Sequence, residues 1–233
     1  MARHNDSRPR FDRDTFRFLA DLAAHNDRAW FAANKPRYEA HVAAPALAFI
    51  EAFARPLADL SRHFRAVPKR TGGSLMRVYR DTRFGKDKTP YKTNVGIQFR
   101  HERGRDVHAP GYYIHVEPGE CFLGAGIWRP EPSALTAIRL EIAERPQLWQ
   151  TCVDDRGFKR YFELAGERLT RLPRNIASDA PHGDDLRRKD FIAICSLSDN
   201  QVVRADFPEW VAARFGACTA LMRFLCGALD LAF

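Results

Sequence analysis

The residues best suited to chemistry gather in one basic segment, which reads RVYRDTRFGKDKTPYKTN from Arg77 to Asn94. It contains six basic and two acidic residues, interleaved with three aromatic rings. Arginine binds phosphate or carboxylate groups through paired N–H donors, and lysine adds a point charge. We therefore expect a shaped, basic loop that binds an anionic small molecule, phosphorylated or carboxylated. The predicted ligand-binding residues within it are Arg77, Tyr79, Arg80, Arg83, Lys86, Lys88, Tyr91, Lys92 and Asn94.

Two other interpretations of this basic segment stay open. Basic residues alternating with Tyr79, Phe84 and Tyr91 are also typical of proteins that follow a nucleic-acid backbone and stack on its bases. No helix-turn-helix, ribonucleoprotein or zinc-finger signature accompanies them, and the sequence lacks a nucleotide-binding glycine loop. Alternatively, Asp81 and Asp87 neutralise the segment internally, and it is a solvated loop without a ligand.

Candidate acid–base residues lie in and beyond the basic segment. Asp81, His115 and Glu117 could exchange protons with a substrate if the fold brings them into one pocket. The spacing of His101, His108 and His115 matches no established zinc signature, so we predict no metal site. The sequence does not identify a cofactor. These residues are compatible with an enzyme and with a simple binding protein.

Four stretches of alternating apolar and polar residues predict the strands that position these side chains. They lie at about residues 76–79, 94–100, 112–117 and 121–128. A hairpin loop at residues 118–119 would pair His115 with Phe122 and Tyr113 with Gly124. Directly opposed residues of an antiparallel pair share a face. One face of this hairpin is therefore apolar core, and the other carries Tyr113, His115, Glu117, Phe122 and Trp128.

The second face of the predicted sheet is short of side chains. Gly96, Gly124 and Gly126 fall on it, where strands usually carry bulky residues. We expect the missing side chains to leave a trough, the kind of concave surface that binds small ligands. Aromatic walls and positive charge would come from Tyr79, Tyr113, Trp128, Arg77, Arg83 and Arg100. The alternative is that a terminal helix covers this face.

The residues on either side of the strands predict helices. Apolar residues recur every three or four positions over about 14–66 and again over about 132–230, with one short strand expected near 191–197. Runs of helix, strand and helix are typical of an α+β fold. We predict an antiparallel sheet of about four to five strands, packed on one face by N- and C-terminal helices. Residues 1–13 read as a disordered lead-in, and residues 14–233 as a single domain.

Helix boundaries in the N-terminal part are predicted from capping residues and prolines. Asp12 or Asp14 is placed to cap the first helix, and Asn26-Asp27 offers the start of a second. Pro36 suits the first turn of a third helix. Further prolines at positions 45 and 56 predict breaks or kinks there.

The composition indicates which cellular compartment and which kinds of binding partner suit the protein. The chain has 233 residues, a net charge of +8 and five scattered cysteines without a Cys-x-x-Cys pair. Positive charge favours acidic partners, or simply solubility. Scattered cysteines suit a reducing compartment, and no apolar run approaches the length of a membrane span. We expect a cytoplasmic protein without membrane contact.

Three stretches of the chain carry a resemblance to a known family. They are FLADLAAHNDRAWFAANKPRYEAHV (Phe18 to Val42), SLMRVYRDTRFGKDKTPYKTNVGIQF (Ser74 to Phe99) and HAPGYYIHVEPGECFLGAGIWRPEP (His108 to Pro132). Together they resemble domain-of-unknown-function family 2461, from about residue 14 to residue 229. The middle stretch is the most specific, and the last third is a looser match. The resemblance implies one compact domain in a cytoplasmic protein. It implies no activity, cofactor or catalytic residue.

Overall fold

The computed structural model describes residues 9–83, 87–104 and 109–233. It shows the predicted α+β fold, with an antiparallel sheet of six strands, slightly more than expected. The strands are β1 (Phe64–Arg65), β2 (Val95–His101), β3 (Gly111–Val116), β4 (Cys121–Ile127), β5 (Glu163–Ala165) and β6 (Phe191–Leu197). The helical segments are α1 (Arg13–Ala24), α2 (Arg28–Tyr38), η1 (Glu39–Ala43), α3 (Ala44–Leu60), α4 (Pro132–Glu144), α5 (Pro146–Asp154), α6 (Arg156–Tyr161), α7 (Gly183–Leu186), α8 (Asp199–Val202), α9 (Phe207–Gly216) and α10 (Thr219–Gly227).

The strands are arranged in the order β1-β2-β3-β4-β6-β5, and every neighbouring pair is antiparallel. The predicted hairpin register is confirmed, because His115 pairs with Phe122 and Tyr113 with Gly124. β6 is the short strand expected in the C-terminal part, and it lies between β4 and β5. The part predicted to be helical from about residue 132 therefore contributes two strands to the sheet.

The predicted strand at 76–79 is wrong. This segment forms isolated bridges, Leu75 with Ile97 and Tyr79 with Tyr91, rather than a continuous ladder. The reason is that β2 begins at Val95, so in the register of Leu75 with Ile97 no strand residue lies opposite the segment beyond residue 77. The segment borders β2 only briefly, through the bonds Gln98 N–H to Ser74 O and Met76 N–H to Gly96 O, and then leaves the sheet.

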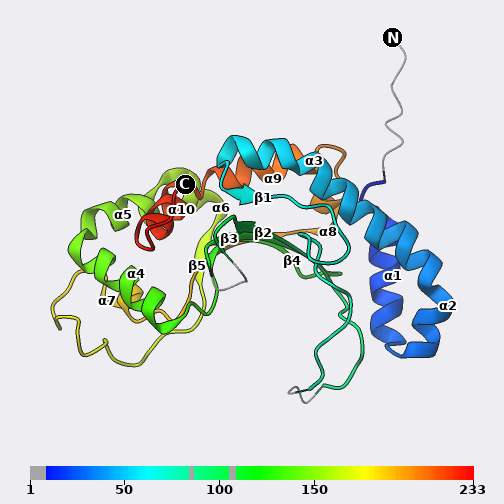
Figure 1. The fold of residues 1–233 in the computed structure, drawn as a ribbon, viewed down its shortest axis with the longest axis horizontal. Coiled ribbons are helices and arrows are strands. Elements are labelled where there is room, and N and C mark those ends of the chain that lie inside the picture. Colours follow the sequence, from blue (N-terminus) through cyan, green and yellow to red (C-terminus); the bar gives the residue numbers. More distant parts are fainter. Residues whose placement is uncertain (1–8, 84–86, 105–108) are drawn as a thin grey trace, which may run out of the picture.

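The apolar face of the sheet is the core, and helices cover it (Figure 1). α3 packs against β2 and α9, and α10 packs against β4 and α5. Aromatic rings join these layers: Phe53 lies 4.9 Å from Phe99, and Tyr112 lies 4.6 Å from Phe215, between ring centroids. No helix of the described residues combines the length and the apolar character needed to cross a membrane.

The helical run α2–η1–α3 contains three prolines without a full break. Pro36 lies inside α2, not at the start of a new helix as predicted, and Pro56 lies inside α3. Pro45 follows the π-helical segment η1 and has no N–H for the carbonyl of His41, four residues earlier. The hydroxyl of buried Thr15 donates to that carbonyl at 2.7 Å. A wider π turn and a side-chain donor thus accommodate Pro45.

Packing begins ahead of residue 14, the predicted start of the domain. Phe11 is buried and contacts the rings of Phe49 and Phe207. The side chains of Asp12 and Asp27 cap α1 and α2, as predicted. The predicted lead-in therefore includes one residue of the core, Phe11, while residues 1–8 lie outside the described part of the chain.

Replacing Thr15 by valine removes the buried donor to the His41 carbonyl while keeping a β-branched side chain. We expect the free energy of unfolding to fall by about 1–3 kcal/mol, because a buried carbonyl loses its hydrogen-bond partner. Part of the loss comes from the capping box, in which Thr15 Oγ1 accepts from the N–H of Asp12. Urea denaturation followed by circular dichroism measures the change.

Two variants control for this effect. Thr15→Ser keeps the hydroxyl and should recover most of the loss. Thr136→Val is the matched control, because the Thr136 hydroxyl also donates to a helix carbonyl, that of Pro132 at 2.8 Å, but on an exposed surface. Equal losses in Thr15→Val and Thr136→Val would contradict a special role for the buried bond.

Candidate functional site

The face of the sheet opposite the core helices is open (Figure 1). On one side of this open face the chain extends below the sheet; we call the described residues of this excursion, 77–83 and 87–93, the arm. On the other side lies the loop that follows β5. The arm is the basic segment from which the sequence predicted ligand binding. Lys86 lies outside the described residues.

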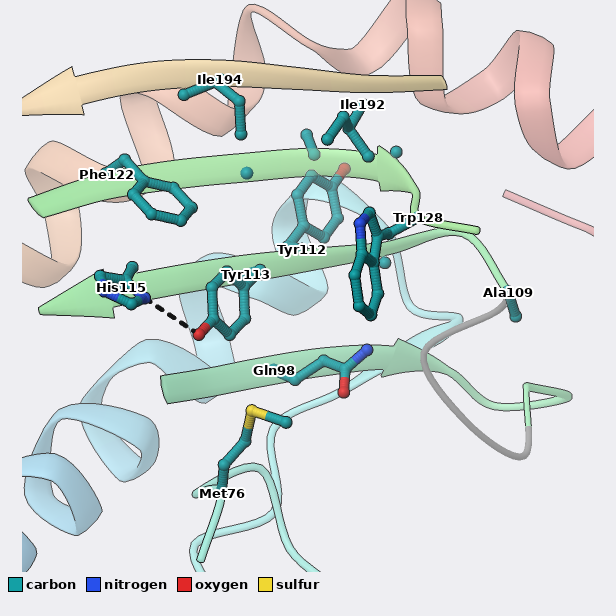
Figure 2. A pocket seen from close by; sticks show the side chains of 14 residues that line it. Met76, Gln98, Ala109, Tyr112, Tyr113, His115, Phe122, Trp128, Ile192 and Ile194 are labelled. Atoms are coloured by element: carbon teal, nitrogen blue, oxygen red, sulfur yellow. Dashed lines mark hydrogen bonds between the residues drawn. The ribbon is translucent and has the colours of Figure 1, made fainter. Parts of the chain in front are cut away.

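A cavity of about 340 Å³ lies on the open face, where the glycines led us to expect a trough. We call it the sheet cavity (Figure 2). None of its lining residues belongs to a helix: they are Met76, Gln98, Ala109, Gly111, Tyr112, Tyr113, His115, Phe122, Gly124, Ala125, Gly126, Trp128, Ile192 and Ile194. Tyr113 and Trp128, predicted as walls, both line it, whereas Arg77, Arg83 and Arg100 do not. The lining is therefore mainly apolar and aromatic.

Three glycines shape the sheet cavity for different reasons. A Cβ on Gly96 would approach the Met76 Sδ and Tyr113 Oη atoms to 2.9 Å, so Gly96 makes room for the Tyr113 hydroxyl. Gly126 has φ +127°, and a Cβ there would lie 2.0 Å from the Phe191 carbonyl oxygen, so the close approach of β4 to β6 requires glycine. A Cβ on Gly124 would meet only ordinary contacts beyond 3.5 Å. Gly124 thus leaves space in the cavity that a side chain could fill.

A chain of hydrogen bonds reaches the sheet cavity from Glu117. The Thr93 hydroxyl donates to Glu117 Oε1 at 2.6 Å, and His115 Nε2 lies 3.0 Å from Glu117 Oε2. On the other side of the imidazole, His115 Nδ1 lies 3.2 Å from Tyr113 Oη and 3.3 Å from Asn94 Nδ2. With Glu117 ionised, Nε2 carries the proton, and Nδ1 accepts from the hydroxyl and the amide. We call Tyr113, His115 and Glu117 the relay.

The surroundings fix the protonation of the two ends of the relay. Burial by itself would raise the pKa of Glu117, but hydrogen bonds from Thr93 and His115 outweigh it, and the pKa lies below its usual range. Burial raises the pKa of Tyr113 to about 12. At neutral pH the relay therefore has a carboxylate at one end and a neutral phenol at the other. The His115 ring is held by stacking on Phe122, with 4.6 Å between ring centroids.

The arm is joined to the N-terminal helices. Its two sides are linked by hydrogen bonds from Arg80 N–H to the Pro90 carbonyl at 2.9 Å and from Lys92 N–H to the Val78 carbonyl at 2.7 Å. Tyr91 stacks on Phe31 of α2 with 4.0 Å between ring centroids. The Asn26 side chain both donates to the carbonyl of Tyr91 and accepts from its N–H, at 3.0 and 3.1 Å.

A second hollow, of about 410 Å³, lies between the arm and the start of α2. We call it the arm hollow. It is lined by Arg28, Tyr79, Arg80, Thr82, Lys88, Pro90 and Tyr91. Four of these residues, Tyr79, Arg80, Lys88 and Tyr91, were predicted as ligand-binding. Arg28 was missed, because it precedes the arm by about 50 residues and only the docking of the arm on α2 brings it close.

The remaining predicted residues are divided among several places. Asp81 forms a bidentate ion pair with Arg83. Arg83 Nε donates to Asp81 Oδ1 at 3.0 Å and Arg83 Nη2 to Asp81 Oδ2 at 2.7 Å, and these hydrogen bonds hold the pKa of Asp81 well below its usual range. Of the three predicted acid–base residues, the structure therefore brings together only His115 and Glu117, while Asp81 pairs with Arg83 on the arm. Arg100 Nε donates to Gln98 Oε1 at 3.3 Å, which places it beside the sheet cavity.

Of the other histidines considered as metal ligands, His101 is bonded to backbone. His101 Nε2 lies 2.8 Å from the Ala232 carbonyl, and its Nδ1 accepts from the Arg103 N–H. His108 lies outside the described residues. Ligand atoms of Asp12, Asp14 and His41 lie within 4.8 Å of one another, but Asp12 is already the cap of α1.

Replacing Glu117 by glutamine should make the protein less sensitive to acid. The folded-state pKa of Glu117 is lowered, so its carboxylate stabilises the fold above the usual glutamate range and loses that effect as the pH falls through the lowered pKa. The difference in free energy of unfolding between wild type and Glu117→Gln should be about 1–2 kcal/mol near pH 7. It should shrink below about pH 4. Urea denaturation across this pH range measures it.

The exposed glutamate Glu144 provides the control for this prediction. Glu144→Gln should leave the free energy of unfolding within about 0.5 kcal/mol of wild type at every pH. A Glu117→Gln difference that is constant with pH would show that the carboxylate charge does not stabilise the relay.

Comparison with known proteins identifies the family. The pattern of the conserved hypothetical protein family DUF2461 matches residues 14–224, which is most of the chain. Neither a search of curated proteins nor a search of solved structures finds a match. The match includes the arm, the hairpin of β3 and β4 and both hollows. The chain therefore belongs to the conserved hypothetical protein family DUF2461.

Proposed function

We propose that this protein binds an anionic small molecule, phosphorylated or carboxylated, in the arm hollow. One observation carries the proposal: Arg28, Arg80 and Lys88 converge on the same hollow from two distant segments of the chain. Guanidinium groups bind phosphate and carboxylate oxygens through paired N–H donors, and an ammonium adds a compact charge. Tyr79 and Tyr91, with 5.5 Å between ring centroids, supply an aromatic wall for the body of the ligand.

Lys92 lies next to this hollow in the chain and supports the same proposal. It is half-buried, and burial together with the nearby Arg77 and Arg80 lowers its pKa. Within the described residues, no carboxylate forms an ion pair with Lys92. A bound anion would offset the repulsion among these three cations, so the cluster favours an anionic ligand.

Internal bonds hold two of the cations in place without neutralising the whole group. Arg80 pairs with Asp87 at 2.5 Å, and Lys88 Nζ donates to the Thr82 carbonyl at 2.8 Å. A carbonyl carries no net charge, so Lys88 keeps its charge for a ligand. Positioned donors bind more tightly than mobile ones, because less side-chain freedom is lost on binding.

Pyrophosphate is a suitable probe for the arm hollow. We expect isothermal titration calorimetry to show binding to the wild type, and Arg28→Gln and Lys88→Gln each to weaken it roughly tenfold, since each removes one charge-assisted hydrogen bond. The matched control is Lys189→Gln, because Lys189 pairs with Glu167 on the exposed surface away from the hollow. No binding to the wild type, or equal weakening in all three variants, would contradict the proposal.

The pH dependence of binding tests the contribution of Lys92. Anion binding favours the ammonium form, so affinity should fall as the pH rises through the lowered pKa of Lys92, below the usual lysine range. Citrate is the probe, because its own charge is constant above neutral pH. In Lys92→Arg the affinity should stay level over the same range, since guanidinium remains protonated. Parallel curves for wild type and Lys92→Arg would exclude Lys92 from the site.

Nucleic acid is a second candidate ligand, favoured by the exposure of Tyr79. Its side chain is 57% exposed on the basic arm, where a base could stack on it. Titration with an oligothymidine at low and moderate salt distinguishes the two candidates. Salt-sensitive binding that Tyr79→Ala weakens, together with no binding of pyrophosphate, would favour nucleic acid.

A cytoplasmic location is part of the same proposal. The structure describes all five cysteines, and each is free and buried. Unpaired thiols persist most readily in a reducing compartment.

A further inference from the structure

The sheet cavity differs from the arm hollow in the chemistry of its walls. Phe122, Trp128, Ile192 and Ile194 surround it, and no charged residue lines it in the described part of the chain except where His115 becomes protonated. An apolar cavity with few polar groups suits a small, uncharged ligand, and those polar groups determine its orientation. The arm hollow, with three cations, suits the opposite kind of ligand. The two hollows therefore call for separate explanations.

Gln98 presents an unused hydrogen-bond donor to the sheet cavity. The residue is only 8% exposed, and its Oε1 accepts from Arg100 Nε. This bond directs the Nε2 amide group towards the cavity, where it lies beside Trp128 (Figure 2). Among the described residues, Gln98 Nε2 has no acceptor. This amide group is open to the cavity, where the carbonyl oxygen of a ligand could accept a hydrogen bond from it.

The relay presents a proton-transfer group to the same cavity. The Tyr113 hydroxyl donates to His115 Nδ1 and accepts from the Asn94 side chain, and Tyr113 lines the cavity. His115 is in turn held by the Glu117 carboxylate, which would stabilise an imidazolium. An acid–base group oriented by a histidine and a carboxylate is the arrangement by which enzymes transfer protons near neutral pH. Tyr113 and Gln98 lie on neighbouring strands as a directly opposed pair.

We propose that the sheet cavity is an acid–base active site that enolises a small, uncharged, mainly apolar carbonyl compound. Tyr113 is the catalytic residue that exchanges the proton, and Gln98 donates to the carbonyl oxygen. His115 and Glu117 are positioning residues that act through Tyr113. The inference does not depend on anion binding in the arm hollow.

The proposed step balances without any co-reactant. The proton on the carbon beside the carbonyl passes to Tyr113 Oη, while the proton of that hydroxyl passes to His115 Nδ1. The electrons of the broken C–H bond form the carbon–carbon double bond, and the carbonyl electron pair moves to oxygen, where Gln98 Nε2 stabilises it. The imidazolium is paired with Glu117. Return of a proton to the same carbon gives exchange, and return to a different carbon gives an isomer.

Proton exchange into benzylacetone tests the inference. This ketone is neutral and mainly apolar, and proton nuclear magnetic resonance in D₂O follows both the loss of its α-proton signals and the line broadening caused by binding. We expect the wild type to accelerate exchange above the buffer rate, and Tyr113→Phe to bind the ketone but exchange it roughly 100-fold more slowly. Tyr161→Phe, which removes a hydroxyl outside the cavity, should match the wild type.

Two further variants separate the cavity from the relay. Gly124→Val fills the floor of the cavity without a backbone clash and should abolish line broadening, whereas Gly183→Ala, in open space on α7, should not. His115→Gln should lower the maximal exchange rate while leaving the half-saturating ketone concentration unchanged, because His115 acts on the proton and not on binding. A purely structural role would change both quantities.

Levulinate, which carries the same methyl ketone beside a carboxylate, completes the test. The uncharged cavity should exchange it far more slowly than benzylacetone, because the carboxylate would have to be buried without a partner. Absence of benzylacetone binding by the wild type would overturn the site. Binding without exchange, or equal exchange by wild type and Tyr113→Phe, would overturn the chemistry. Neither result would bear on pyrophosphate binding in the arm hollow.

Discussion

Antiparallel pairing of β3 with β4 is the constraint on which the rest of the structure depends. The turn at residues 118–119 fixes the register, and the register assigns every side chain of the hairpin to one of two faces. Ile114 and Leu123 are buried in the core, and Tyr113 and His115 consequently face the open side. A shift of one residue would bury the relay and expose the core. The stability of the apolar face therefore holds the polar face in position.

The open face remains hollow because several of its positions lack side chains, and each absence has its own consequence. Gly126 permits β6 to approach β4, Gly96 gives the Tyr113 hydroxyl its place, and Gly124 leaves the floor of the cavity empty. The cavity is thus built into the sheet itself. It rests on the most deeply packed strands of the molecule, and this suits a site whose groups must keep fixed distances.

The arm follows a different principle, since it is held by its base and not by a ladder of strand pairing. Stacking of Tyr91 on Phe31 and the double hydrogen bond from Asn26 attach it to α2. This attachment brings Arg28 to the cations of the arm. The molecule thus carries an apolar cavity beside the relay and a separate cationic hollow. Arg80 connects them electrostatically, because its charge helps to lower the pKa of Glu117.

Local sequence determined the elements and the faces of this protein. Alternation and the 118–119 turn gave the hairpin, its register and the polar face, because these depend on neighbours along the chain. Capping by Asp12 and Asp27 was predictable for the same reason. Tertiary structure decided which residues and segments distant in the sequence come together. Asp81 lies on the arm and His115 in the relay, the segment at 76–79 leaves the sheet because β2 begins only at Val95, and Arg28 joins the arm hollow through packing between distant segments. Such contacts depend on which surfaces dock, and no spacing within the sequence encodes that directly.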